Sequence, residues 1–304
     1  MPGERPESLA EERPVATATV YLNGVFLPRS EAKIDPEDRG FQFGDGVYEV
    51  LLVKDGLPLF AKEHFERLER SAGDIEIPLP VTREAFDQLV KDLIRTNHLV
   101  EGLVYLQLTR GVAPRAHTFP EHVTPTLYVS VKAQPDPDFA DGVACIVFPD
   151  ERWHRLDLKT VNLLPNVLAS EAAHRKGAFE AILVRPDGTV TECSHSNVWI
   201  VKQGICLTHP ADRNILHGVT RKTALQALAS HGIPHREEAF SEHDLRLADE
   251  VFLTSTTAGV APIVELDGRP VGDGRPGPVT QRARAAYRDE VGQELARARA
   301  TAGF

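Results

Sequence analysis

The sequence predicts an α+β fold in which short strands and amphipathic helices are mixed within two blocks. The chain has 304 residues, which is enough for two domains with separate hydrophobic cores. Apolar segments of strand length and of helix length follow one another along both blocks. Between the blocks, the stretch 133–138 (AQPDPD) holds two prolines and two acidic residues and cannot continue a central strand. We therefore predict a mobile leader at 1–16, a small domain at 17–133, a linker at 134–142 and a large domain at 143–304.

The composition argues against several classes of protein. Hydrophobic residues make up 42% of the chain and charged residues 26%, which is typical of a globular protein in water. No apolar run reaches the length of a membrane span, and the first residues lack the apolar core of a secretory signal, so we expect a cytoplasmic protein without a membrane partner. The net charge of -10 argues against nucleic acid. Three cysteines without paired spacing argue against disulfides and against a zinc site.

The first block carries signals for an antiparallel sheet with two helices. Asn23-Gly24 is a typical two-residue hairpin turn, and Asp55-Gly56 marks a second turn. Thr82 is a suitable N-cap for a helix. The expected strands lie in the hairpin 18–28 and at 47–53, 57–60, 103–110 and 126–132, and the expected helices lie at 62–75 and 82–99.

The second block opens with an apolar strand at 143–148. Helices are expected at 164–176 and 219–231, because Gly177 and Gly232 suit the position that follows a helix C-terminus. Further strands are expected at 179–185, 189–193, 197–202 and 250–254.

Lys159 is the candidate catalytic residue. It is the only lysine between Lys132 and Lys176, and it lies in the largely apolar stretch 156–166 (LDLKTVNLLPN). An ammonium group would be poorly solvated there, which favours the neutral amine. A neutral lysine amine attacks carbonyl carbons and forms Schiff bases with substrates or with pyridoxal phosphate. The alternative is a lysine that reaches from a strand end to water.

Glu192 is the candidate partner of a cofactor ring. It lies where a predicted strand gives way to the polar turn 193–196 (CSHS). A carboxylate buried at such a place needs a proton donor or a cation. The pyridine nitrogen of pyridoxal phosphate would serve, because an adjacent acid keeps the ring protonated and able to accept electrons. A strand-end glutamate that faces water is the alternative.

Two stretches are suited to a phosphate group. Residues 216–220 (LHGVT) open a predicted helix, whose free N–H groups and positive dipole end attract anions. Residues 254–259 (TSTTAG) supply four hydroxyl groups and a glycine directly after a strand. Arg67, on a predicted helix, adds a possible cation. Simple helix capping, a threonine-rich turn and an exposed arginine are the alternatives.

Arg115 and His117 form a candidate carboxylate site in the loop 109–117 (TRGVAPRAH). In an extended segment, a spacing of two residues puts both side chains on one face. The guanidinium group can bind a carboxylate with two hydrogen bonds and the imidazole with one. A solvated basic loop is the alternative. Earlier in the chain, the glycine-rich stretch 38–49 (DRGFQFGDGVYE) predicts a tight loop that approaches a ligand or another subunit and ends near Tyr48.

Seven motifs in order resemble those of the fold-type IV pyridoxal-phosphate transaminases. They are FGDGVYE, RLxxSA, TRGxxxRAH, LKTVNLLPNVLA, TExSxSNVW, ILxGVTR and TSTTxG, and the resemblance extends from about residue 18 to about residue 285. It is greatest to the D-amino-acid transaminases. The resemblance implies a two-layer α/β small domain and a larger β-barrel-like domain with helices. It also implies a homodimer that binds pyridoxal 5′-phosphate between the domains of each chain.

The resemblance also implies a role for each candidate residue. Lys159 would be the Schiff-base lysine and Glu192 the acid at the pyridine nitrogen. The cofactor phosphate would be bound by Arg67, Thr220, Ser255, Thr256 and the backbone of Val219. The substrate carboxylate would be bound by Tyr48, with Arg115 and His117 supplied by the neighbouring subunit.

The implied reaction exchanges an amino group between a D-amino acid, such as D-alanine or D-glutamate, and 2-oxoglutarate or pyruvate. A branched-chain L-amino-acid transaminase, an (R)-amine transaminase and an aminodeoxychorismate lyase stay open as activities of the same fold, as does a cofactor-binding protein without turnover. Branched-chain transaminases and the lyases share the lysine and the glutamate but lack the Arg-x-His pair.

The chain departs from the family pattern at three places. His195 stands in the serine-rich turn, where it would change the polarity near the cofactor ring. His217 stands where lysine is more usual, so the charge near the phosphate would differ. The leader at 1–16 has no counterpart in the family.

Overall fold

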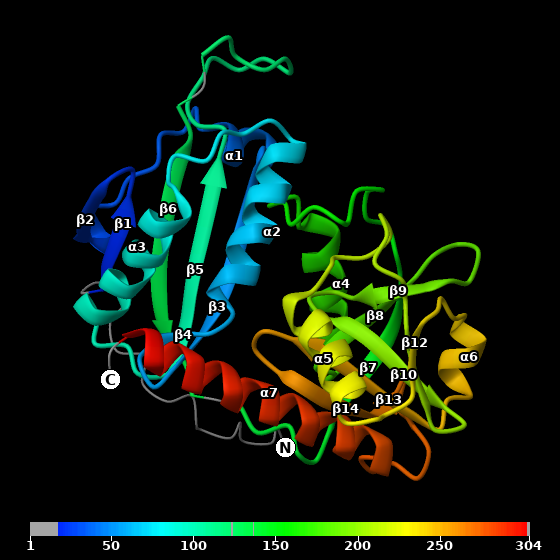
Figure 1. Cartoon of the computed structure of the whole chain (residues 1–304). Coiled ribbons are helices and arrows are strands. Elements are labelled where there is room, and N and C mark those ends of the chain that lie inside the picture. The colour runs from blue at the N-terminus through cyan, green and yellow to red at the C-terminus, as the bar shows by residue number, and fades with distance from the viewer. Residues whose placement is uncertain (1–17, 123, 136, 303–304) are drawn as a thin grey trace, which may run out of the picture.

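The computed structural model describes residues 18–122, 124–135 and 137–302 of the protein. The leader predicted at 1–16 lies outside these residues. Two β-sheets with their helices stand side by side (Figure 1). This mixture of strands and helices confirms the predicted α+β class. The division into domains at the predicted residues stays a prediction.

The first sheet has six strands in the order β2-β1-β6-β5-β3-β4, and each strand is antiparallel to its neighbours. The strands are β1 (Thr19–Leu22), β2 (Val25–Pro28), β3 (Gly46–Lys54), β4 (Leu57–Pro58), β5 (Gly102–Thr109) and β6 (Thr126–Ala133). Helices α2 (Ala61–Asp74) and α3 (Arg83–Thr96) pack against this sheet. Leu51 of β3, Phe65 of α2 and Phe86 of α3 belong to their shared core.

Local sequence signals explain most of the boundaries in this block. Asn23 and Gly24 have positive φ angles of 48° and 97°, as a two-residue hairpin turn requires. The Thr82 hydroxyl accepts a hydrogen bond from the Ala85 N–H at 3.3 Å and caps α3 as predicted. The strand expected at 57–60 is shorter than predicted, because Phe60 adopts a φ of 53° as the N-cap residue of α2.

The second sheet has nine strands in the order β12-β11-β10-β13-β14-β7-β8-β9, with β15 paired to β14. Its strands are β7 (Val143–Pro149), β8 (Glu180–Val184), β9 (Val190–Cys193), β10 (Asn197–Lys202), β11 (Ile205–Thr208), β12 (His235–Glu237), β13 (Glu250–Ser255), β14 (Gly259–Leu266) and β15 (Arg269–Pro270). Its helices are α4 (Leu164–Arg175), α5 (Val219–Ser230) and α6 (Glu242–Arg246). Gly177 and Gly232 follow α4 and α5 with φ angles of 71° and 62°, which confirms the two predicted helix ends.

Several elements were not predicted from the sequence. They are the short helices η2 (Arg29–Glu31), α1 (Arg39–Phe43) and α6, the strands β11, β12, β14 and β15, and the long helix α7 (Pro278–Ala302). Helix α7 packs on the second sheet and reaches β4 of the first one (Figure 1). Glu294 Oε1 accepts a hydrogen bond at 3.2 Å from the N–H of Phe60, the N-cap residue of α2. Helix α7 therefore links the two blocks. Among the described residues, no helix combines the length and the apolar character that a membrane span requires.

Candidate active site

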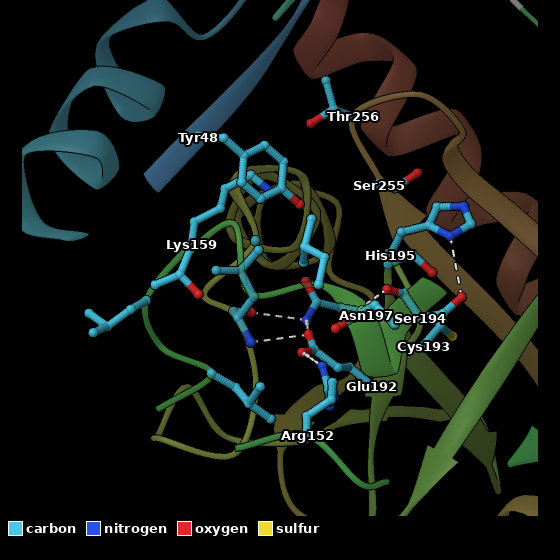
Figure 2. A pocket seen from close by; sticks show the side chains of 18 of the residues that line it. Tyr48, Arg152, Lys159, Glu192, Cys193, Ser194, His195, Asn197, Ser255 and Thr256 are labelled. Atoms are coloured by element: carbon cyan, nitrogen blue, oxygen red, sulfur yellow. Dashed lines mark hydrogen bonds and ion pairs between the residues drawn. The ribbon is translucent and has the colours of Figure 1, made fainter. Parts of the chain in front are cut away.

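A cavity between the two sheets collects most of the predicted site residues (Figure 2). Its walls come from β3, the segment 152–166, the turn between β9 and β10, the N-terminus of α5 and the end of β13. The predicted residues that line it are Tyr48, Arg67, Lys159, Glu192, Val219, Thr220, Ser255 and Thr256. Arg115 and His117 are not among the residues that line this cavity.

Lys159 is held against the start of β3 by backbone pairing. The Tyr48 N–H donates to the Lys159 carbonyl at 3.0 Å, and the Val161 N–H donates to the Gly46 carbonyl at the same distance. The Ser71 hydroxyl accepts from the Lys159 N–H at 3.3 Å. This pairing brings the two side chains together, and Nζ of Lys159 lies 4.0 Å from the centroid of the Tyr48 ring (Figure 2). The amine is therefore placed at the cavity wall.

Glu192 lies near the end of β9, and its carboxylate is buried among hydrogen-bond donors. Oε1 accepts from Arg152 at 2.5 Å, and Oε2 accepts from the Asn197 side chain at 2.9 Å and the Leu216 N–H at 3.0 Å. Burial raises the pKa of Glu192, and the Arg152 guanidinium opposes this effect. Because a carboxylate has about four acceptor positions, capacity remains for one further donor from the cavity.

Arg152 is a site residue that was missed in the sequence. Its buried guanidinium donates to both oxygens of Asp150 at 2.9 Å and to the Thr191 hydroxyl at 3.2 Å. These contacts fix the group so that Nη1 meets Glu192. The sequence did carry a signal, because Asp150 and Arg152 directly follow a buried apolar strand, where charged side chains need partners.

Arg67 is buried on α2 and pairs with Glu49 of β3. Its Nε and Nη2 donate to the two Glu49 oxygens at 2.7 and 2.8 Å, and its Nη1 donates to the His217 carbonyl at 3.2 Å. His64 Nδ1 also lies 2.7 Å from Glu49. Burial acts to raise the pKa of Glu49, but Arg67 and His64 together lower it below its ordinary value. Glu49 was also missed, although a carboxylate inside the apolar run 47–53 signals a buried partner.

The N-terminus of α5 opens onto the cavity. Its N-cap residue, Gly218, has no side chain, so the first N–H groups of the helix have no side-chain cap. A Cβ atom at Gly218 would collide with the Asn197 side chain, which also donates to the Leu216 carbonyl at 3.0 Å. The Thr220, Ser255 and Thr256 hydroxyls lie around the same cavity. N–H groups at a helix start, hydroxyls and an arginine suit a phosphate group.

Residues 46–266 match the family described as Amino-transferase class IV. The chain belongs to this family. D-alanine aminotransferase of Bacillus licheniformis is 42% identical over 280 residues, which cover 91% of this chain and 99% of that relative.

Two solved structures resemble this class IV aminotransferase along most of their length. The branched-chain amino acid aminotransferase of Escherichia coli has a TM-score of 0.84 at 26% identity, covering 90% of this chain and 95% of that chain. The PLP-bound form of a hypothetical aminotransferase from Mycobacterium tuberculosis has a TM-score of 0.77 at 26% identity, covering 90% and 99%. The predicted fold-type IV architecture is therefore confirmed.

In this aminotransferase a second buried carboxylate supports the turn after β9. Glu180 of β8 is fully buried and accepts from the His195 N–H, from the Ser194 hydroxyl at 3.3 Å and from the Ser196 hydroxyl at 2.8 Å. The His195 imidazole lies 3.2 Å from the same carboxylate and is 45% exposed. His195 therefore stands at the open side of the cavity.

His217, a second histidine that was expected to depart from the family pattern, contributes its backbone carbonyl to the site. Its carbonyl accepts from Arg67, and its Nε2 lies 3.0 Å from the Asp212 carbonyl. Burial lowers the pKa of His217, which favours the neutral imidazole. A lysine at this place would carry a positive charge, whereas burial disfavours a charge on His217.

The connection between β5 and β6 projects from the body of the aminotransferase and carries Arg115 and His117 (Figure 1). Both side chains are exposed. Both contact the Phe43 ring, with Arg115 Cζ 4.9 Å from its centroid and the His117 ring centroid at 5.6 Å. The two residues therefore lie beside one another and do not line the main cavity. His117 lines an adjoining pocket with Trp153, Thr160 and Asn162, which also line the main cavity.

Proposed function

We propose that this aminotransferase uses pyridoxal 5′-phosphate to exchange amino groups between D-amino acids and 2-oxo acids. The observation that carries the proposal is the placement of Lys159 and Glu192 in one cavity with the open N-terminus of α5. The solved relative that is named as a PLP-bound form supports the choice of cofactor.

The donor groups of the cavity fit this cofactor. The Lys159 amine suits the cofactor aldehyde and would hold it covalently. Glu192 has acceptor capacity for a protonated ring nitrogen. Five groups would hold the phosphate: the Arg67 guanidinium, the Val219 backbone, and the hydroxyls of Thr220, Ser255 and Thr256.

Glu192, Lys159 and Tyr48 would have different roles in the reaction. Bound pyridoxal phosphate supplies an aldehyde carbon for the substrate amine and a ring that accepts electrons. Glu192 keeps the ring nitrogen protonated. Lys159, once its amine is free, would take the proton from the substrate Cα at Nζ and deliver it to the former aldehyde carbon of the cofactor, as general base and then general acid. The Tyr48 ring at 4.0 Å limits the positions that Nζ can take.

The D-amino-acid preference rests on Arg115 and His117. Their side chains lie beside one ring and present a guanidinium and an imidazole, the two groups that suit a carboxylate. The identity to D-alanine aminotransferase, 42%, exceeds that to the branched-chain enzyme, 26%. D-alanine and D-glutamate are the proposed donors, and 2-oxoglutarate and pyruvate the proposed acceptors.

The proposed assembly is a homodimer in which the β5–β6 loop enters the neighbouring cavity. The loop projects from its own chain (Figure 1). Arg115 and His117 are exposed and are not among the residues that line the main cavity of that chain. The three cysteines are free and buried, which suits a reducing compartment, and the cytoplasm is the proposed location.

A half-reaction tests the substrate. The purified protein with bound cofactor is given D-alanine or L-leucine without an acceptor, and the visible absorbance of the cofactor is followed. Loss of the band with D-alanine alone, with release of pyruvate, is the expected result. Loss with L-leucine alone would identify a branched-chain transaminase instead. Lys159→Ala should be inactive with both amino acids, and full activity of this variant would refute the role of the lysine.

A mixture of two inactive chains tests the shared site. Arg115→Ala/His117→Ala loses carboxylate binding, and Lys159→Ala loses the reactive amine. In a mixed dimer, the cavity that retains Lys159 would receive an intact loop from the Lys159→Ala chain. Activity should therefore return in the mixed dimer at about half the wild-type value, since one of two sites is complete. A mixture without activity would contradict the shared site.

A further inference from the structure

We propose that Arg39 is a positioning residue of the substrate-carboxylate site, because it holds the backbone between Arg115 and His117 in place. This inference rests on the proposed function of that pair. Arg39 is the first residue of α1, lies far from Lys159 in sequence and is absent from the cavity lining.

The central contact joins Arg39 to the middle of the projecting loop. Arg39 is 3% exposed, and its Nη1 donates to the Ala116 carbonyl at 2.6 Å. Ala116 is the residue between Arg115 and His117, so this bond fixes the peptide that connects the two binding side chains. A buried, charged donor gives a stronger hydrogen bond than water or a neutral group would.

Arg39 is itself held by a buried ionic cluster. Its Nε donates to Asp45 Oδ2 at 2.8 Å, and Arg110 binds both oxygens of Asp45 at 2.8 and 3.0 Å. The remaining donors of Arg110 reach the Ile75 and Glu76 carbonyls at 2.6 and 3.0 Å, at the end of α2. Burial acts to raise the pKa of Asp45, but Arg110 and Arg39 lower it, so the carboxylate stays charged at neutral pH.

Aromatic contacts and backbone bonds complete the support of the loop. The Phe43 ring lies 4.8 Å from Arg39 Cζ and also contacts Arg115 and His117. The Arg39 N–H donates to the Gly111 carbonyl at 2.9 Å, at the base of the loop. Helix α1 and its flanks therefore form a base for a loop whose tip is exposed. The glycine-rich stretch 38–49 was expected to approach a ligand or another subunit. We infer that its first part, which contains α1, instead supports the β5–β6 loop.

Two substitutions at Arg39 test the proposal. Arg39→Lys keeps a cation for Asp45, but one ammonium group cannot reproduce the planar fork that serves Asp45 and Ala116 together. Arg39→Met removes both contacts. Loss of a charged hydrogen bond corresponds to about tenfold in an equilibrium constant. The KM for D-alanine should therefore rise about tenfold or more in both variants, and the Kd for propionate, which binds through its carboxylate alone, should rise in parallel. The cofactor absorbance should not change.

A matched control separates positioning from loss of stability. Leu93 of α3 is fully buried in the core of the first sheet. It is not part of the cluster that Arg39 forms with Phe43, Asp45 and Arg110. Leu93→Ala should lower Tm and leave both the KM and the propionate Kd unchanged. If Leu93→Ala raised them as much as Arg39→Lys, general destabilisation would explain the effect and the proposal would be wrong.

Two further measurements test whether Arg39 acts through the β5–β6 loop. In the Arg115→Ala/His117→Ala background, Arg39→Met should cause no additional loss of propionate binding, because the two groups that it positions are gone. In a mixed dimer with Lys159→Ala, the intact loop of the second chain should restore the KM of the Arg39→Met chain. Additive losses, or failure of this rescue, would mean that Arg39 acts elsewhere.

The outcomes also distinguish this inference from the proposed function. If the double variant Arg115→Ala/His117→Ala binds propionate poorly while Arg39→Lys binds it normally, the carboxylate site is supported and the role of Arg39 is refuted. If the double variant binds propionate normally, the carboxylate site itself is refuted.

Discussion

Nζ of Lys159 lies 4.0 Å from the centroid of the Tyr48 ring, and the two residues are joined by a backbone hydrogen bond of 3.0 Å. The bond belongs to a short antiparallel pairing between residues 46–48 and 159–161. The amine and the phenol therefore come from two segments more than a hundred residues apart, and β3 sets the position of both. A change in β3 should affect the cofactor and the substrate together.

Tyr48→Phe tests the role of the hydroxyl group apart from that of the aromatic ring. The ring face next to Lys159 is kept, whereas the hydroxyl proposed to bind the substrate carboxylate is lost. We expect the cofactor absorbance to be unchanged and the KM for D-alanine to rise about 10- to 100-fold, as for loss of a hydrogen bond to a charged group. Tyr48→Leu, which also removes the ring contact, is the comparison and should disturb cofactor binding. An unchanged KM in Tyr48→Phe would exclude the hydroxyl from the carboxylate site.

Arg152→Met should destabilise the protein and shift its pH profile. The substitution leaves Glu192 buried without a cation, which costs about 3–5 kcal/mol in the free energy of unfolding. Arg152 opposes the rise in the pKa of Glu192, so its removal raises that pKa further. The acidic limb of the kcat profile should therefore move to higher pH. Arg246→Ala breaks only surface ion pairs and should cost about 1 kcal/mol or less. Equal unfolding midpoints in urea for the two variants would contradict the prediction.

Glu49 should make stability depend on pH in the acid range. Its pKa in the folded protein lies below the ordinary value of 4.5, because Arg67 and His64 outweigh the effect of burial. As the pH falls below 4.5, the unfolded chain binds a proton that the folded chain does not bind, so the free energy of unfolding decreases. Glu49→Gln removes this contribution and leaves Arg67 unpaired.

Urea unfolding across the acid range measures the effect. The variant should be less stable at pH 7, and its stability should fall less steeply with acid. Asp87→Asn, at a surface ion pair, is the control and should keep the wild-type slope. A wild-type slope in Glu49→Gln would mean that Glu49 does not contribute to the acid dependence.

Substitutions at His195 and at Glu180 should differ in their effect on the free energy of unfolding. The His195 side chain is 45% exposed, so His195→Ser should change the free energy of unfolding by no more than about 0.5 kcal/mol. Glu180→Ala removes the acceptor of three donors in the turn after β9, two of which are the hydroxyls of the buried residues Ser194 and Ser196. A buried donor left unpaired costs about 1–3 kcal/mol. Glu180→Ala should also weaken cofactor binding, because the turn lines the cavity. Equal stability of the two variants would show that Glu180 does not hold the turn.

Much of the fold could be predicted from local signals. Turn residues such as Asn23-Gly24, the Thr82 cap and the glycines that follow α4 and α5 act within a few residues of themselves, so the sequence around them is sufficient. Helix α7 was missed although its alanine- and arginine-rich sequence has high helix propensity. The short strands β12 and β15 carry little local signal, because three or two residues show no period.

The sequence by itself determined most of the candidate residues that line the cavity. A lysine in an apolar stretch, a glutamate at a strand end and a hydroxyl-rich turn are recognisable because their side chains have few other uses in such surroundings. Only the tertiary structure decided how these groups are held. Arg152 meets Glu192 across 40 residues, Arg67 meets Glu49 across 18, and Arg39 reaches Ala116 across 77. A buried charge must find a partner in space, and which residue becomes that partner depends on the packing of strands and helices that lie far apart in the sequence.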